Sequence, residues 1–199
     1  MFKRAFDIVF SAGWLIGFAP LLLAVAILVR LKLGSPVLFI QERPGLRAKP
    51  FRMVKFRTMT DARGPDGELL PDEQRLTPFG KFLRSSTLDE FPEMWNVLLG
   101  DMSVVGPRPL LIRYVARYDA FQARRMEVKP GVTGWAQVNG RNSLSWEEKF
   151  ALDVWYVDHR TFWLDMKIVV MTFFRVFARS GIDAASGGAV EEFKGSSRN

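Results

Sequence analysis

The sequence of 199 residues contains no cysteine and a single histidine, His159. The absence of cysteine excludes a disulfide framework, a thiolate nucleophile and a cysteine-ligated metal. One histidine argues against a histidine-based catalytic triad or a zinc cluster. Any catalysis therefore depends on acidic, basic, tyrosine or hydroxyl side chains, and metal ions that prefer oxygen ligands are their natural partners.

Acidic residues are in the minority. The chain has 28 Lys and Arg against 21 Asp and Glu, a formal net charge of +7. This excess indicates an anionic partner such as nucleic acid, acidic lipid or a phosphorylated substrate. Hydrophobic residues make up 48% of the chain and aromatic residues 13%, which excludes a disordered protein and allows one domain with a core. Charge alone does not choose among the three partners.

One long apolar run lies near the N-terminus, where residues 8–29 carry no charge. Its length matches the ~20 residues of a membrane-spanning helix and exceeds the apolar core of a signal peptide, about 7–15 residues. Pro20 interrupts the run, and proline kinks or breaks a helix. Basic residues, which favour the cytoplasmic side of a membrane, flank both ends: Lys3, Arg4, Arg30 and Lys32. A kinked spanning helix and a re-entrant helix that returns to the same face both fit.

Local patterns predict a small α+β unit after the apolar run. Two strands within 36–59 form a hairpin around Pro44 and Gly45, and residues 60–78 form an exposed loop. We expect four helices, at 79–85, 89–99, 110–127 and 145–159. A Gly-rich loop is expected at 130–142.

A last helix is expected at 161–179, with one polar stripe on an otherwise apolar surface. The stripe consists of Asp165, Thr172, Arg175 and Arg179. Such a helix fits either the bilayer interface or a position facing the protein core. The small and polar residues of 181–199 indicate a flexible tail.

The stretch SSTLDEFPEMWN (85–96) places two carboxylates, Asp89 and Glu90, side by side in this basic chain. They have a structural explanation, because Asp89 alone, or Thr87 together with Glu90, is suited to cap a helix that begins here. They also have a chemical explanation, because Mg²⁺ is usually bound by one or two carboxylates together with substrate phosphates.

The cations of the chain favour the chemical explanation. Arg108 lies between two prolines in GPRP, which restricts its backbone, and planar Arg side chains suit bidentate phosphate recognition. Further cations lie on the predicted strand, before the acidic pair and in the Gly-rich loop: Lys55, Arg57, Arg84 and Arg141. Together with the apolar run, they predict a phosphate-handling site at a membrane surface.

The sequence resembles the bacterial sugar transferase family, the monotopic phosphoglycosyl transferases that begin glycoconjugate assembly on a polyprenyl phosphate. Its small size is similar to that of the diacetylbacillosamine-loading type. The matching stretches follow in order along almost the whole chain: QERPG (41–45), KFRTM (55–59), LRSSTLDEFPEMWNVLLGDMSVVGPRP (83–109), PGVTGWAQVNGRN (130–142), WEEKFALDVWYV (146–157) and LDMKI (164–168).

The resemblance implies roles for the acidic pair. Asp89 is expected to be the nucleophile that attacks the β-phosphate of a UDP-sugar, releases UMP and carries the phosphosugar as a covalent intermediate. Glu90, with Asp89, is expected to bind Mg²⁺. Polyprenyl phosphate then attacks the intermediate to give polyprenyl-diphospho-sugar.

The resemblance also implies roles outside the pair. Arg84 and Arg108 are expected to hold phosphate groups, and Gln137 and Arg141 lie in a loop expected to close over the nucleotide. Lys55 matches a basic position on the family's strand. Asp165 matches an acid of the C-terminal helix that is expected to be structural. Pro20 matches the family's break in the N-terminal helix, although Ala19 replaces the usual serine before it. This match favours the re-entrant helix.

The predicted organisation is α+β and mostly helical, with a small β-hairpin and amphipathic interfacial helices around a cytoplasmic catalytic site. Residues 1–34 form a re-entrant membrane anchor, 35–180 the catalytic domain and 181–199 the tail. The predicted partners are a UDP-sugar, polyprenyl phosphate and membrane lipid at the cytoplasmic face of the bacterial inner membrane, with no nucleic acid and with homo-oligomerisation left open. The alternatives are a non-catalytic basic scaffold that binds anionic lipid, a membrane-held nucleic-acid-binding protein, and a transferase that acts without a covalent intermediate.

Overall fold

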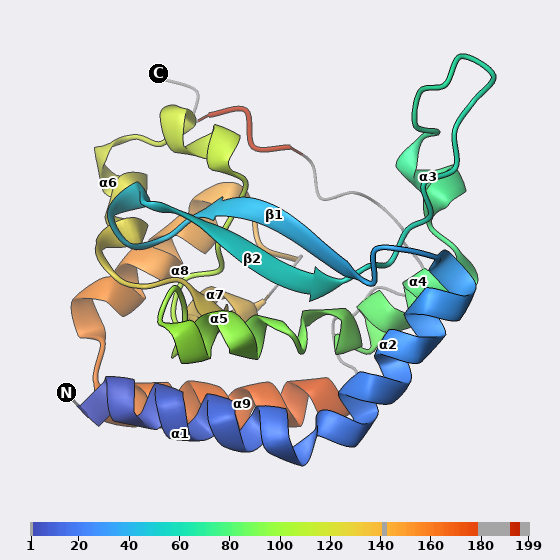
Figure 1. Ribbon diagram of the computed structural model, residues 1–199. Helices are drawn as coiled ribbons and strands as arrows, with labels where there is room; N and C mark the ends of the chain where they lie inside the picture. Colours follow the sequence, from blue (N-terminus) through green and yellow to red (C-terminus); the bar gives the residue numbers. More distant parts are fainter. Residues whose placement is uncertain (1, 141–142, 179–191, 196–199) are drawn as a thin grey trace.

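The structure is a computed structural model that describes residues 2–140, 143–178 and 192–195. It is mostly helical, as the sequence predicted (Figure 1). The hairpin is confirmed: β1 (Leu38–Pro44) pairs with β2 (Pro50–Phe56) in antiparallel register, with Gln41 opposite Met53. A second, parallel pair joins β3 (Ser103–Val105) to β4 (Gly131–Thr133).

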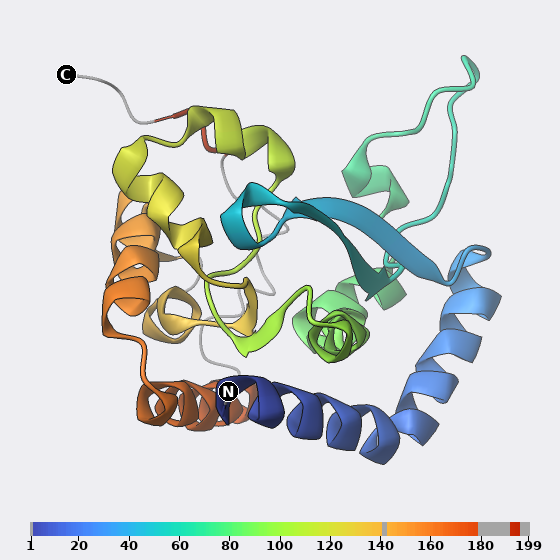
Figure 2. The same cartoon turned by 60° about the vertical axis from the view of Figure 1, so that its left-hand side comes forward.

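Two long helices lie side by side beneath the rest of the molecule, α1 (Phe2–Gly17) and α9 (Phe162–Ala178) (Figure 1). Above them lie α5 (Glu93–Leu99) and the hairpin, and α8 (Trp146–His159) flanks them. Figure 2 shows the same layers from a second direction, with α2 (Ala19–Leu33) rising from the end of α1 towards the start of the hairpin.

The N-terminal apolar run is a bent pair of helices, in which α1 and α2 meet at 62°. Pro20 occupies the first turn of α2. The bend follows from the sequence, because Pro20 lacks the N–H that would continue the hydrogen bonds of α1. No single described helix is long and apolar enough to cross a membrane. The bent pair of α1 and α2 together has the length and apolar composition of a membrane segment.

The polar residues at the start of α1 attach this helix to the rest of the fold. Lys3 Nζ lies 2.6 Å from Asp165 Oδ2 on α9. Arg4 donates hydrogen bonds of 2.6 and 2.8 Å to the carbonyl oxygens of Val97 and Leu98 at the end of α5. These two cations were interpreted from the sequence as signals of membrane topology, and the structure gives them a packing role.

Asp7 makes the third attachment of α1. Its buried Oδ1 accepts hydrogen bonds from Ser103 Oγ at 3.0 Å and from the backbone N–H of Val104 at 2.9 Å. The helix is thereby fixed to β3. Since the other end of the bent pair leads directly into β1, both ends of the N-terminal segment are attached to the same body.

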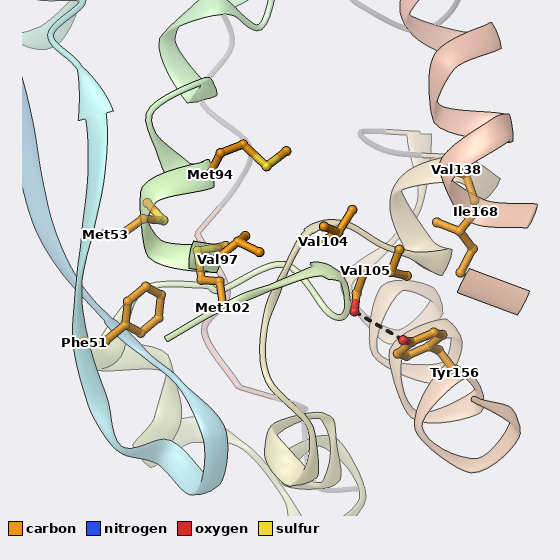
Figure 3. Close-up of a cluster of buried hydrophobic side chains, with 10 residues drawn as sticks. All are labelled: Phe51, Met53, Met94, Val97, Met102, Val104, Val105, Val138, Tyr156 and Ile168. Carbon is orange, nitrogen blue, oxygen red and sulfur yellow. Dashed lines mark hydrogen bonds between the residues drawn. The ribbon is translucent and has the colours of Figure 1, made fainter. Parts of the chain in front are cut away.

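The main core lies between the hairpin, α5, β3 and the helices α8 and α9 (Figure 3). Its buried side chains come from all of these elements: Phe51, Met53, Met94, Val97, Met102, Val104, Val105, Val138, Tyr156 and Ile168. Tyr156 Oη donates to Asp165 Oδ1 at 2.7 Å and lies 3.3 Å from the Val105 carbonyl oxygen. Asp165 is therefore a structural residue, as the resemblance implied. A smaller cluster packs Val29 of α2 against Leu83 and Phe56.

The predicted helix over 110–127 is wrong. The chain forms a 3-10 segment, η3 (Ile112–Arg117), then the short helix α6 (Ala120–Ala123) and a 3-10 turn, η4 (Arg124–Glu127). Asp119 starts α6 through a capping box with Gln122. Arg125 then turns inward to a buried ion pair with Asp153, at 2.6 Å. The new helix start and the inward cation break what would otherwise be one helix.

Other boundaries also differ from the predictions. The helix expected at 89–99 begins only at Glu93, after a 3-10 turn, η2 (Leu88–Glu90). The loop 60–78 contains α3 (Asp72–Arg75), and the Gly-rich loop contains β4 and α7 (Trp135–Asn139). The helices expected at 79–85 and 145–159 are confirmed as α4 (Pro78–Ser85) and α8. The side chain of Thr77 caps α4, and that of Ser145 caps α8.

Helix α9 contributes the buried Ile168 to the core and exposes other apolar side chains at the surface. Asp165 is buried, and Thr172 Oγ1 lies 2.7 Å from Thr133 Oγ1. Trp163 and Phe174 on the same helix are 79% and 72% exposed. Arg179 of the stripe lies outside the described residues. The helix thus packs against the core with part of its apolar surface and exposes the rest.

One part of the predicted tail packs on the fold. Phe193 is 2% exposed and lies among Tyr114, Tyr118, Trp146 and Phe150, at ring-centroid distances of 5.0–5.9 Å. Arg117 donates hydrogen bonds to Glu192 and to the Phe193 carbonyl oxygen. The segment 192–195 thus covers η3 and α8.

Candidate active site

Glu90 is the centre of a charged cluster. Arg108 donates to both carboxylate oxygens of Glu90, and its Nη1 lies 3.1 Å from Oε2. Lys55 on β2 places its Nζ 2.7 Å from Glu90 Oε1 and 3.0 Å from Glu93 Oε1. The fold thereby brings Lys55 and Arg108, which are distant in sequence, together at Glu90.

Neither carboxylate of the acidic pair caps a helix. Thr87, which precedes η2, has a left-handed backbone (φ 61°) and makes no capping bond with its side chain. The position before α5 is Pro92, which has no capping side chain. The structural explanation of the acidic pair therefore does not hold, and the burial of Asp89 needs another reason.

Thr87 holds the backbone in a conformation that β-branched residues rarely adopt. The turn is closed by hydrogen bonds from the Thr87 N–H to the Arg84 carbonyl oxygen (3.1 Å) and from the Glu90 N–H to the Thr87 carbonyl oxygen (3.2 Å). This strained turn separates α4 from η2 and directs Asp89 and Glu90 into the interior. Such outliers cluster at functional sites.

Asp89 is buried, at 8% exposure, and its carboxylate has no hydrogen-bond or ion-pair partner within the described residues. Burial, followed by the negative charge of Glu90, raises the pKa of Asp89 to about 6. Burial also acts on Glu90, but Arg108 and Lys55 outweigh it and hold the pKa of Glu90 below its usual range. The pair thus consists of one anion held in ion pairs and one buried carboxylate for which the charges of Lys55, Arg108 and Arg84 only partly offset burial. Such an environment is typical of a reactive group.

A cavity of about 690 Å³ adjoins the pair. Its wall contains three residues that the resemblance assigned to substrate, Arg84, Arg108 and Gln137, together with Glu90. Asp89 and Lys55 do not line it: Lys55 is paired with Glu90, and Asp89 directly precedes Glu90 in the chain. Arg141 lies outside the described residues. The fold thus brings Arg84, Glu90, Arg108 and Gln137 to one cavity, and their roles stay predictions.

The cavity wall carries polar atoms that the fold does not satisfy. Gln137 donates to the Val132 carbonyl oxygen at 3.0 Å, but its Oε1 is buried without a partner. Arg84 donates to Thr58 Oγ1 at 3.0 Å and forms no ion pair with an acid among the described residues. Buried polar groups are normally hydrogen-bonded, so the Oε1 of Gln137 indicates a polar ligand. Arg84 is exposed and adds a positive charge to the same cavity wall.

The family comparison agrees with the motifs and the site. Residues 1–179 match the model of the family described as bacterial sugar transferase. The chain belongs to the bacterial sugar transferase family. This bacterial sugar transferase is 53% identical over 194 residues to a protein of Bacillus subtilis (strain 168) named an uncharacterized sugar transferase, EpsL, covering 98% of this chain and 96% of the relative.

Two other relatives of this bacterial sugar transferase are named for their substrates. The UDP-glucose:undecaprenyl-phosphate glucose-1-phosphate transferase of Klebsiella pneumoniae is 40% identical over 187 residues, covering 89% of this chain and 40% of that protein. The UDP-N-acetylgalactosamine-undecaprenyl-phosphate N-acetylgalactosaminephosphotransferase of Aeromonas hydrophila is 36% identical over 178 residues, covering 85% and 42%. The chain thus spans about two fifths of these two relatives. The predicted family and the enzyme class, a transferase, are confirmed.

Sequence reasoning missed three groups of this transferase's site. Arg43 lines the cavity and donates to the Pro109 carbonyl oxygen at 3.3 Å, although QERPG had been singled out as a motif. Glu93 is buried beside Lys55, and burial followed by the charge of Glu90 raises its pKa to about 7. The buried pair Arg125–Asp153 also reaches the cavity wall. The spacing of Glu90 and Glu93 was a usable signal, since residues three apart lie on one helix face.

The donor set fits Mg²⁺ bound with substrate. The described residues contain no cluster of three or more acidic or histidine side chains arranged for a metal ion. Mg²⁺ usually needs only one or two carboxylates, because phosphate oxygens and water complete its shell. Asp89, which forms no ion pair among the described residues, supplies such a pair together with Glu90. Glu90 is also held by Arg108 and Lys55, so a cation would share it with them.

Proposed function

We propose that the protein transfers a phosphosugar from a UDP-sugar to polyprenyl phosphate, giving polyprenyl-diphospho-sugar and UMP. One observation carries this proposal: a buried carboxylate that forms no ion pair among the described residues, Asp89, adjoins a cavity whose wall presents Arg84 and Arg108. The named relatives support the reaction class, because they act with undecaprenyl phosphate and UDP-linked sugars. A scaffold that only binds lipid has no use for a desolvated acid, which is costly to keep.

The first step is nucleophilic substitution at phosphorus. A carboxylate oxygen of Asp89 bonds to the β-phosphorus of the UDP-sugar, the bond from that phosphorus to the oxygen bridging to the α-phosphate breaks, and UMP leaves with the electron pair. The pKa of about 6 leaves Asp89 mostly ionised at neutral pH. Its lack of hydrogen bonds and its burial leave the attacking oxygens poorly solvated, which favours reaction with phosphorus.

The second step restores the enzyme. A phosphate oxygen of polyprenyl phosphate bonds to the phosphorus held by Asp89, and the bond between phosphorus and the carboxylate oxygen breaks. The product is polyprenyl-diphospho-sugar, and Asp89 is again a carboxylate. Splitting the transfer in two replaces one reaction between two large anionic substrates by two easier steps.

The surrounding cations offset the negative charge of both substrates. Arg108, fixed by Glu90 in a bidentate pair, faces the cavity with a preset orientation. Arg84, which forms no ion pair among the described residues, binds the phosphates that enter. Bound Mg²⁺, held by Asp89 and Glu90, would add electrostatic stabilisation of the phosphate oxygens. Gln137 Oε1 has no hydrogen-bond partner in the described part of the chain and offers an acceptor to the nucleotide or sugar.

We also propose a monotopic position at the cytoplasmic face of the bacterial inner membrane. Apolar side chains are exposed along α1, α2 and α9, with Ile16 77%, Leu31 76% and Trp163 79% exposed. Exposed apolar surface of this extent marks a membrane or partner contact. Because Lys3 binds α9 and α2 leads into β1, an inserted bent pair has to return to the side of the catalytic residues. This supports the re-entrant prediction.

Labelling in sealed vesicles tests the topology. Single cysteines can be added to this cysteine-free chain before Ile8 and after Val29. We expect an impermeant thiol reagent to reach both positions from the same side. Labelling from opposite sides would require a spanning helix and would contradict the proposal.

Release of UMP tests the activity. The purified protein is supplied with Mg²⁺, undecaprenyl phosphate and a panel of UDP-sugars that includes UDP-glucose and UDP-N-acetylgalactosamine. We expect turnover with at least one donor, and its loss in Asp89→Asn. Asp101→Asn, an exposed acid at the end of α5, is the matched control and should keep full activity. An Asp89→Asn variant that retains a tenth of wild-type activity would contradict the nucleophile assignment.

A further inference from the structure

The cavity has an uncharged side that the proposed chemistry does not use. Besides the arginines, its wall includes Phe10 and Trp14 of α1 and Val169, Thr172 and Phe173 of α9. None of these five side chains carries a charge. The α1–α9 wall, as we name these five residues, therefore offers nothing to a nucleotide diphosphate and suits an apolar ligand.

The α1–α9 wall is continuous with the catalytic pair. The ring of Trp14 lies 4.9 Å from that of Phe91, the residue directly after Glu90. Trp14 Nε1 is buried and has no acceptor among the described residues, which leaves a donor for a bound ligand. An apolar chain along this wall therefore ends next to Glu90, at the arginines.

The outer edge of the α1–α9 wall opens onto the apolar surface of the molecule. Phe173 lines the cavity and is also 43% exposed, while Phe174 and Ile16 nearby on the two helices are 72% and 77% exposed. Figures 1 and 2 show α1 and α9 together on one side of the molecule. A hydrocarbon chain can pass from a bilayer to this wall without crossing water.

The other side of the cavity has a different character. Tyr114 of η3 and Trp146 and Lys149 of α8 line it. Burial lowers the pKa of Lys149, whose Nζ lies 4.8 Å from the ring centre of Trp146. Both figures place η3 on the far side of the hairpin from α1 and α9. Aromatic rings beside a cation suit a base and its phosphates.

We infer that the α1–α9 wall binds the first isoprenoid units of the acceptor lipid, with the lipid phosphate directed to Arg84 and Arg108. The nucleotide then occupies the η3–α8 side, and the two substrates reach the acidic pair from opposite sides. This inference rests on the proposed function, since it names where one of its two substrates binds. It gives α1 a second role: the helix is an anchor and also a wall of the acceptor site.

Two neighbouring valines of α9 provide a matched test. Val169 lines the cavity, whereas Val170 is 52% exposed and does not. Val169→Phe narrows the α1–α9 wall, so we expect the KM for undecaprenyl phosphate to rise at least tenfold. UMP release in a single turnover without lipid should stay within twofold of wild type. Val170→Phe should leave both quantities unchanged. The inference would be overturned if Val169→Phe and Val170→Phe had the same KM for undecaprenyl phosphate. It would also be overturned if Val169→Phe slowed both half-reactions equally.

Photolabelling tests the site without a mutation. A polyprenyl phosphate with a diazirine in its first isoprene unit is irradiated with the wild-type protein in lipid nanodiscs, and the adducts are mapped by peptide mass spectrometry. We expect adducts within 10–14 and 169–173 that excess undecaprenyl phosphate removes. Adducts confined to α2, or to the η3–α8 side, would overturn the inference, even if Val169→Phe does not fold. Absence of UMP release by the wild type would instead refute the proposed function, and the labelling would still locate a lipid site.

Discussion

Asp89 is predicted to reduce the stability of the fold that contains it. Burial and the neighbouring Glu90 raise its pKa from 3.8 to about 6. A carboxyl whose pKa is raised on folding binds its proton more tightly in the folded state. Between pH 4 and 6 the free energy of unfolding therefore falls as the pH rises, and above pH 6 the full cost is present.

The size of this cost follows from the shift in pKa. At about 1.4 kcal/mol per unit, a shift of roughly two units costs at most about 3 kcal/mol above pH 6. Asp89→Asn has nearly the same shape and no charge, so it removes the cost. For a chain of this length each kcal/mol changes Tm by roughly 2–4 °C. We expect Asp89→Asn to raise Tm at pH 8 by several degrees, and by no more than about 12 °C, while activity is lost.

Thermal unfolding in detergent at pH 8 and at pH 4 measures this effect. The gain of Asp89→Asn over wild type should be present at pH 8 and nearly absent at pH 4, where Asp89 is protonated. The control is Asp153→Asn, which also changes a buried aspartate but leaves Arg125 without its ion-pair partner. That variant should lose stability. A lower Tm for Asp89→Asn at pH 8, or an equal gain at both pH values, would refute the reasoning.

Three further predictions follow from the site and the core. UMP release in a single turnover should fall about tenfold per pH unit below pH 6, since only ionised Asp89 attacks, and a flat profile between pH 5 and 7 would contradict this. Arg108→Lys, which loses the bidentate contact with Glu90, should reduce kcat/KM for the UDP-sugar at least tenfold, with an unchanged circular dichroism spectrum; full activity would exclude a phosphate-binding role. Phe193→Ala should lower Tm because it empties an aromatic cluster, at a cost of about 3–5 kcal/mol; an unchanged Tm would show that the 192–195 segment does not pack in solution.

The parts of the fold that depend on local signals could be predicted from the sequence. The bend at Pro20, the hairpin at Pro44 and Gly45, and the helix that Ser145 caps each depend on residues close together in the chain. The break in the expected helix 110–127 also had a local signal, the capping pair Asp119 and Gln122, which was overlooked.

The remaining features depend on contacts between distant residues. Glu90 meets Arg108 eighteen positions away and Lys55 thirty-five positions away. No local pattern shows that Lys3 and Arg4 bind α9 and α5 rather than lipid headgroups. The motifs could name Asp89, but only the fold reveals that its carboxylate is buried beside the anion Glu90 and that the nearby cations do not fully offset this. That environment, and not the residue type, makes it a candidate nucleophile.

Intact-protein mass spectrometry tests the central claim most directly. The wild type and Asp89→Asn are incubated with Mg²⁺ and the accepted UDP-sugar, without lipid, and are then analysed under acidic conditions. We predict that the wild type gains the mass of one phosphosugar, mapped to Asp89 by peptide sequencing, and that undecaprenyl phosphate removes it. Asp89→Asn should gain no mass. Continued UMP release without any adduct, or an adduct on Glu90 or Glu93 in place of Asp89, would contradict the account.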